Sequence, residues 1–233
     1  MMKRAKALEA RQQRAAEEKS GLLKDLEIVE GLKLFPQPYF ARTLAALREA
    51  APVYGGRAVC APVSFTVEQG DRIALEGGNG SGKSSLLRLL AGADLAHTGT
   101  VRLGSGVVLS CVPQDAGFLR GDLRDLAAQR QIDESLFKAV LRKMGLERVQ
   151  FGKDMAELSA GQKKKVLLAA SLSRQAHLYI WDEPMNYIDI FSRGQIAGLI
   201  QKYSPTMLLV EHDRAFAESV STRRIYLSSR SSD

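Results

Sequence analysis

A glycine-rich run in the first half of the chain has the residue types that bind a phosphate group. It reads Gly77-Gly78-Asn79-Gly80-Ser81-Gly82-Lys83-Ser84-Ser85, which contains the spacing Gly-x4-Gly-Lys-Ser. The apolar stretch Ile73-Ala74-Leu75 predicts a buried strand before it, and leucines at helical spacing predict a helix after it. Glycines let backbone N–H groups turn towards a phosphate, and a helix start adds positive potential. We expect Lys83 to reach the β- and γ-phosphates of a nucleotide and Ser84 to bind Mg²⁺.

Two adjacent carboxylates follow a second apolar stretch. Asp182-Glu183 comes directly after Leu178-Tyr179-Ile180-Trp181, which predicts another buried strand. At the carboxyl end of that strand, Asp182 would face the glycine-rich loop and bind Mg²⁺ directly or through water. Glu183 would point elsewhere and polarise an attacking water as a general base. Because an Asp-Glu pair alone is also typical of a helix start, this interpretation depends on the other motifs.

Further motifs occur in a fixed order around these two, and together they make the chain resemble an ABC-type ATPase domain. Gln114 after Val112-Pro113 resembles the Q-loop of that family, and Leu158-Ser159-Ala160-Gly161-Gln162 resembles its signature motif. Asn186-Tyr187-Ile188-Asp189 resembles the D-loop, and His212 resembles the switch histidine. The motifs extend from about residue 50 to residue 213, which is most of the chain.

This resemblance implies a role for each matching residue, with ATP and Mg²⁺ as the bound species. Gln114 would contact Mg²⁺ and sense the attacking water, Glu183 would act as the base, and His212 would sense the γ-phosphate. Tyr54 stands where the family places a ring that stacks on adenine, although it would also suit an ordinary strand. The signature residues would contact ATP held by a second, opposing domain, and they are Ser159, Ala160, Gly161 and Gln162. Glycine is commoner at the position of Ala160, but its backbone N–H is retained.

The spacing of the motifs narrows the choice of subfamily. The stretch between Lys83 and Ser159 has room for a small helical subdomain but not for a long coiled coil. This excludes the DNA-repair and chromosome-organising ABC ATPases and leaves the ABC-F translation factors and the nucleotide-binding subunits of membrane transporters. Three segments are similar to the second ATPase domain of the antibiotic-resistance, ribosome-protecting branch of ABC-F, namely residues 160–170, 181–193 and 210–216. The resemblance implies a ribosomal or rRNA partner, whereas the transporter alternative implies a membrane subunit.

Strands that alternate with helices predict an α/β fold of the P-loop NTPase, ABC type. We expect a mostly parallel sheet, an antiparallel β subdomain and a small helical subdomain over residues 35–233. Residues 1–34 are rich in Lys, Arg, Glu and Ala and predict a charged linker helix. Lys163-Lys164-Lys165 predicts a solvated helix face, with rRNA or phosphate contact as the alternative.

The composition of the chain is that of an ordinary globular protein of 233 residues with a net charge of +7. The positive charge favours a polyanionic partner but does not separate a ribosome from a membrane surface. No uncharged segment approaches the roughly 20 residues that span a bilayer, so we expect a cytoplasmic protein. The resemblance reaches only the C-terminal half of an ABC-F protein. The chain therefore either pairs with a copy of itself or another ABC domain, or it binds ATP as a fragment that stays inactive without a partner.

Overall fold

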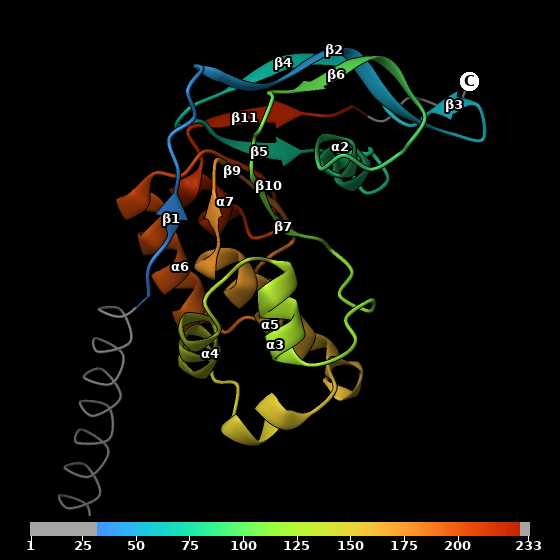
Figure 1. Ribbon diagram of the computed structural model, residues 1–233. Helices are drawn as coiled ribbons and strands as arrows, with labels where there is room; N and C mark the ends of the chain where they lie inside the picture. The colour runs from blue at the N-terminus through green and yellow to red at the C-terminus, as the bar shows by residue number, and fades with distance from the viewer. Residues whose placement is uncertain (1–31, 229–233) are drawn as a thin grey trace, which may run out of the picture. The chain divides into compact units, whose positions relative to one another are not determined.

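The structure is a computed structural model that describes residues 32–228 of the chain (Figure 1). The charged helix expected over residues 1–34 lies, except for its last three residues, outside the described residues. The folded unit described below begins at Leu34. Within the described range, no helix combines the length and the apolar character that crossing a membrane requires.

A five-stranded parallel sheet with the strand order β11-β5-β10-β9-β7 forms the centre of this unit. Every residue of β9 (Leu178–Asp182) and β10 (Met207–Val210) is buried, as expected for strands that are covered on both faces. β10 pairs with both β9 and β5 (Arg72–Glu76), while β7 (Leu109–Val112) and β11 (Arg223–Tyr226) are the outer strands. The carboxyl ends of all five strands therefore lie at one edge of the sheet.

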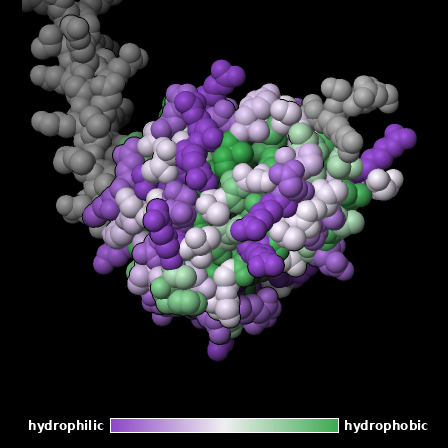
Figure 2. All heavy atoms as spheres, turned by 90° about the horizontal axis from the view of Figure 1, so that it is seen from above, coloured by the Kyte–Doolittle hydropathy of each residue, from purple (hydrophilic) through white to green (hydrophobic). Residues whose placement is uncertain are grey.

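An antiparallel sheet lies beside the parallel one, at the top of Figure 1. Its long strand β2 (Thr43–Tyr54) pairs with β4 (Val63–Glu68), β6 (His97–Leu103) and the short β3 (Arg57–Ala58). Apolar side chains of β2, β4, β5, β9, β10 and the helix α2 (Lys83–Leu90) pack into one core. The face over the antiparallel sheet mixes hydrophilic side chains with smaller hydrophobic patches (Figure 2). These findings confirm the ABC-type α/β fold.

The helices follow the predicted pattern with one difference. The helical pattern over residues 122–145 forms two helices, because the chain turns at Gln131 (φ 55°) and Asp133 caps a new helix start. α5 (Ala160–Ser173) is buried along most of its length, and its residues from Val166 to Ser173 have no exposed member. The remaining elements are β1 (Phe35–Pro36), α3 (Leu123–Gln129), α4 (Glu134–Lys143), η1 (Arg148–Gly152), η2 (Met155–Glu157), β8 (Gln175–Ala176), α6 (Ile190–Tyr203) and α7 (Arg214–Val220).

Candidate functional site

The candidate site forms where segments that follow four parallel strands meet. The glycine-rich loop follows β5, Gln114 follows β7, Glu183 follows β9 and His212 follows β10. The carboxyl edge of a parallel sheet is where the ends of such strands converge and where ligands bind in folds of this kind. Here the converging segments enclose a cavity of about 450 Å³. It is lined by Tyr54, Val59, Asn79, Gly80, Ser81, Gly82, Lys83, Ser84, Ser85, Gln114, Glu183 and His212.

The glycine-rich loop wraps around the side chain of Lys83. The Lys83 ammonium donates to the carbonyl oxygens of Gly77 at 3.0 Å and Gly78 at 2.9 Å. Gly77 has φ +145°, and a Cβ atom there would overlap the carbonyl oxygen of Leu227 and lie 2.7 Å from the Ser81 hydroxyl oxygen. The Ser81 hydroxyl is itself buried and has no hydrogen-bond partner among the described residues. Only glycine therefore fits at the first position of the loop, because its φ is positive and the Leu227 backbone lies against it.

Asp182 offers a free oxygen beside this loop. The residue is 5% exposed, and its Oδ1 has no hydrogen-bond partner within residues 32–228. Burial raises the pKa of the Asp182 carboxyl, while a hydrogen bond from the Ser84 side chain opposes that rise. A buried carboxylate oxygen without a partner is costly, and a hard divalent cation with oxygen ligands removes that cost. The two residues therefore fit Mg²⁺.

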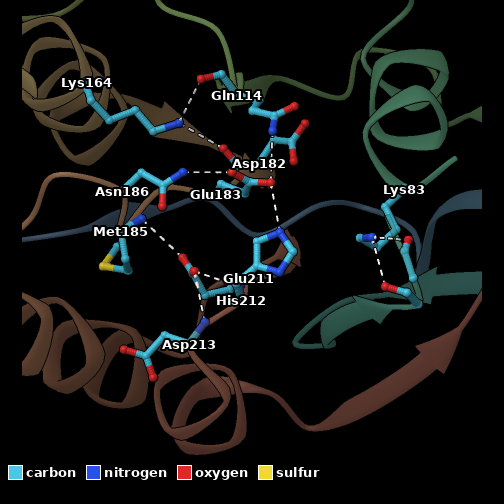
Figure 3. Close-up of polar contacts among 12 residues, drawn as sticks. Lys83, Gln114, Lys164, Asp182, Glu183, Met185, Asn186, Glu211, His212 and Asp213 are labelled. Carbon is cyan, nitrogen blue, oxygen red and sulfur yellow. Dashed lines mark hydrogen bonds and ion pairs between the residues drawn. The ribbon is translucent and has the colours of Figure 1, made fainter. Parts of the chain in front are cut away.

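Glu183 is the centre of the polar contacts in the site (Figure 3). Its Oε1 accepts from the Gln114 amide at 2.9 Å and lies 3.1 Å from Nε2 of His212. Its Oε2 accepts from the Asn186 amide at 2.7 Å. The backbone of Glu183 has φ 47°, a region that non-glycine residues rarely adopt. These contacts fix the direction of the carboxylate, which the sequence could assign to catalysis but could not orient.

Lys164 corrects the prediction of a solvated face on α5. Its side chain is 3% exposed, and its ammonium donates to the carbonyl oxygens of Pro113 (2.9 Å), Gln114 (3.4 Å) and Asp182 (2.9 Å). Burial lowers the pKa of Lys164, and the nearby carboxylates, first Asp182 and then Glu183, oppose this. The helical spacing of the sequence could have predicted this burial. Leu167, Leu168 and Ser171 lie three, four and seven residues after Lys164, so they share its face of the helix, and all three are buried.

Glu211 is a second residue to which the sequence assigned no role. Its carboxylate accepts from the backbone N–H groups of Met185 at 3.1 Å, His212 at 2.7 Å and Asp213 at 3.2 Å (Figure 3). It thereby ties the turn after β9 to the loop after β10, which carry Glu183 and His212 respectively. Only its position next to His212, at the end of a strand, could have indicated this.

The signature residues lie outside the cavity. Ser159 caps α5 by accepting from the Gln162 N–H at 3.3 Å, and the Gln162 side chain accepts from the Ser159 N–H at 2.9 Å. Ser159 and Ala160 are exposed, and Gly161 packs on Tyr187, where an added Cβ would lie 3.2 Å from the Cβ of that tyrosine. Tyr54, by contrast, does line the cavity, with its hydroxyl 3.0 Å from that of Ser85. Gly77, Gly78 and Asp182 do not line the cavity themselves, but they contact its lining residues Lys83 and Ser84. Of the predicted residues, the fold therefore leaves only those of the signature motif apart from this group.

Comparison with known proteins gives a family match. Residues 60–186 match the family model described as "ABC transporter". The chain is 28% identical over 192 residues to the "Ribosome protection protein VmlR" of Bacillus subtilis (strain 168), a match covering 78% of this chain and 34% of that protein. It is 34% identical over 196 residues to the "Aliphatic sulfonates import ATP-binding protein SsuB 2" of Pseudomonas aeruginosa (strain UCBPP-PA14), covering 78% and 71% respectively.

A solved structure, "RNase-L Inhibitor", superposes with a TM-score of 0.63 at 26% identity and covers 81% of this chain and 38% of that one. The match with VmlR covers about a third of the length of that protein (34%). The family match contains the glycine-rich loop, the signature residues and the two carboxylates Asp182 and Glu183 at the end of β9. The chain belongs to the ABC family of ATP-binding domains.

Proposed function

We propose that the cavity binds ATP with Mg²⁺ and that the chain hydrolyses ATP when a second ABC domain closes over it. The observation that carries this proposal is the position of Glu183, whose carboxylate is held by Gln114, Asn186 and His212 at the wall of the cavity that contains the glycine-rich loop. A carboxylate with a fixed direction beside a phosphate-binding loop is the arrangement that general-base catalysis of phosphoryl transfer to water requires.

The residues of the loop bind the triphosphate in this proposal. Lys83 leaves the carbonyl oxygens of Gly77 and Gly78 and donates to the β- and γ-phosphates, and the N–H groups from Gly78 to Ser85 surround the phosphate oxygens. The ring of Tyr54 stacks on adenine. Ser84, Gln114 and Asp182 hold Mg²⁺, which when bound neutralises charge on the phosphates.

Glu183 and its neighbours act on the attacking water. Glu183 accepts a hydrogen bond from the water and takes its proton as the water oxygen bonds to the γ-phosphorus. The bond between that phosphorus and the oxygen bridging to the β-phosphate breaks, and ADP leaves with the electron pair of that bond. Gln114 and His212 both contact Oε1 of Glu183, so they orient the carboxylate. His212, which lines the cavity, would also sense the γ-phosphate. Asn186 holds the other carboxylate oxygen.

A second ABC domain supplies the signature residues. In this chain Ser159 and Ala160 are exposed and outside the cavity, and so is Tyr187 (68% exposed), which packs beside Gly161. An aromatic residue exposed beside polar residues suits an interaction surface. The Ser159, Ala160, Gly161 and Gln162 of one domain would contact the γ-phosphate bound by the other, so the partner is a second copy or another ABC chain.

Two substitutions test the assignment of the site. Glu183→Gln keeps the size of the side chain and removes the base, so ATP should still bind while turnover falls at least about a hundredfold. Lys83→Ala should lose affinity for a fluorescent ATP analogue. Unchanged turnover in Glu183→Gln would show that Glu183 is not the base. Normal binding of the analogue by Lys83→Ala would show that the glycine-rich loop does not bind the nucleotide.

We further propose that the chain is ABC-F-like and works in the cytoplasm on ribosomes, with residues 1–34 as a charged linker and residues 35–233 as the ATPase domain. Support comes from the similarity to VmlR and from the net charge of +7, which suits rRNA. The second candidate is a transporter subunit, favoured by the match that covers 71% of SsuB 2. Co-sedimentation of the intact chain with ribosomes or with membranes, in the presence of ATP, separates the two candidates.

A further inference from the structure

A second cavity lies at the opposite edge of the parallel sheet from the candidate nucleotide site. Its volume is about 550 Å³, and its lining includes Val108 and His177, which directly precede β7 and β9. Most residues that line the first cavity follow the carboxyl ends of the parallel strands, whereas Val108 and His177 precede the amino ends. The two cavities share no lining residue, so the second is a separate site.

Two arginines line this second cavity without a carboxylate partner. Arg130 follows α3 and Arg174 follows α5, and neither forms an ion pair within residues 32–228. The guanidinium of Arg130 donates to the carbonyl oxygen of Cys111 at 3.4 Å, which is a long, weak hydrogen bond. Burial lowers the pKa of Arg130, the neighbouring Cys111 opposes this, and the charge of Arg174 lowers the pKa further. Two like charges partly withdrawn from water are unfavourable unless an anion compensates them.

Two further polar residues of the lining, His177 and Asp133, form no ion pair with either arginine among the described residues. Nδ1 of His177 accepts from the Val108 N–H at 2.9 Å, so a neutral ring carries its proton on Nε2 and acts there as a donor. The acidic residue of the lining, Asp133, is exposed and caps α4 by accepting from the Leu136 N–H at 2.7 Å. The cavity also has apolar walls formed by Phe35, Val108, Ile132 and Leu136.

We propose that this cavity binds a phosphorylated small molecule, with Arg130 and Arg174 holding its phosphate and the apolar walls holding the remainder. A phosphate monoester carries nearly two negative charges at neutral pH, which matches two guanidinium groups better than the single charge of a carboxylate or of an RNA phosphodiester. Guanidinium groups also bind phosphate oxygens in a fixed, two-pronged geometry. A volume of about 550 Å³ falls within the range of small-molecule sites and exceeds what one phosphate fills.

Calorimetric titration with inorganic phosphate at constant ionic strength tests the site. The full chain carries Lys83→Ala, so that the glycine-rich loop is disabled in every sample. We expect saturable binding that Arg174→Gln weakens at least about tenfold, because it removes a charge-assisted contact. Arg102→Gln removes the same charge from an exposed position on β6 outside the cavity and should leave binding unchanged.

Several results would overturn the proposal. The first is the absence of saturable phosphate binding. The second is that Arg102→Gln weakens phosphate binding as much as Arg174→Gln does. The third is that acetate binds as tightly as phosphate. Binding of an RNA oligonucleotide that depends on Arg174, without phosphate binding, would assign the arginines to RNA instead. The test is independent of the ATP site, since the lysine of that site is already replaced.

The stability of the variant supplies a second readout. Because Arg174 adds a like charge next to Arg130 and has no carboxylate partner among the described residues, Arg174→Gln should melt at the same temperature as its parent or higher when no phosphate is present. Added phosphate should raise the melting temperature of the parent more than that of the variant. A lower melting temperature for the phosphate-free variant would show a structural role for Arg174 and contradict the proposal.

Discussion

At the scale of single residues, the candidate site contains charged side chains that backbone groups hold in place, above all Lys164. Asp182 and Glu183 are adjacent carboxylates, and the buried Lys164 ammonium donates to the carbonyl oxygen of Asp182 and to two carbonyl oxygens of the segment that carries Gln114. Lys164 therefore connects the segments that hold the proposed metal ligands and the proposed base. Among residues 32–228, Gln114 is the one cavity-lining residue to which the Lys164 ammonium donates a hydrogen bond, and it does so through the Gln114 carbonyl oxygen. We therefore expect Lys164 to position Gln114 and Glu183.

Replacing Lys164 by methionine tests this positioning role. Lys164→Met keeps the volume but leaves carbonyl oxygens without their donor, so the free energy of unfolding should fall by about 1–3 kcal/mol. Turnover should fall at least about tenfold while the dissociation constant of ATP stays nearly constant, because the change affects the base rather than the loop.

The matched control is Lys163→Met on the neighbouring, partly exposed residue, which should leave all three quantities unchanged. Denaturant unfolding measures the free energy of unfolding, a steady-state ATPase assay measures turnover, and nucleotide titration measures the dissociation constant of ATP. A variant that loses ATP affinity and turnover equally would contradict the positioning role.

At the scale of elements, α5 joins the outer surface to the inside of the site. Its capping box is formed by Ser159, which is exposed, and Gln162, which is partly exposed. Its second turn carries the buried Lys164. Its last turns contact β9, where the Trp181 indole N–H donates to the Ser171 hydroxyl at 2.8 Å. The start of this helix sets the orientation of the signature residues. A substitution at the cap should therefore change the stability of this helix.

Removal of the cap should destabilise α5. Ser159→Ala removes the hydroxyl that accepts from the Gln162 N–H, so the free energy of unfolding should fall by about 1 kcal/mol. Ser159→Thr retains a hydroxyl and should lose less. Urea unfolding followed by the fluorescence of Trp181, the single tryptophan of the chain, measures both variants. Equal stability of Ser159→Ala and the parent chain would show that the cap contributes nothing.

At the scale of the whole molecule, the two halves of the proposed ATPase site lie apart. The cavity is at the carboxyl edge of the sheet, and the exposed signature residues do not line it. Because contact with the γ-phosphate would require both, the proposed reaction needs two ABC domains. The extent of pairing, and therefore the rate per chain, should depend on concentration.

Two complementary variants test whether the pairing is between copies of this chain. Lys83→Ala lacks the loop lysine, and Ser159→Arg blocks the signature surface, so each should be inactive alone. In an equimolar mixture, mixed pairs hold one intact site, and a substantial part of the ATPase activity should return. The parent chain should also lose turnover per molecule on dilution.

Constant turnover per molecule down to concentrations at which the chain is monomeric contradicts the need for a second domain. Turnover of the parent that appears only when another ABC domain is added would show that the partner is a different chain.

The sequence by itself determined the glycine-rich loop between a strand and a helix, the carboxylate pair at the end of β9 and the family of the fold. These features are local, because a strand, a turn with glycines and a helix lie within a few residues of one another and their spacing is visible directly. The contacts of Lys164, which lies 51 residues from Pro113, required the tertiary structure. The same holds for Glu211, which links two strand ends, and for the two arginines at the far edge of the sheet. In each case the environment of a charge is made by segments that only folding brings together, and burial rather than residue type decides what that charge can do.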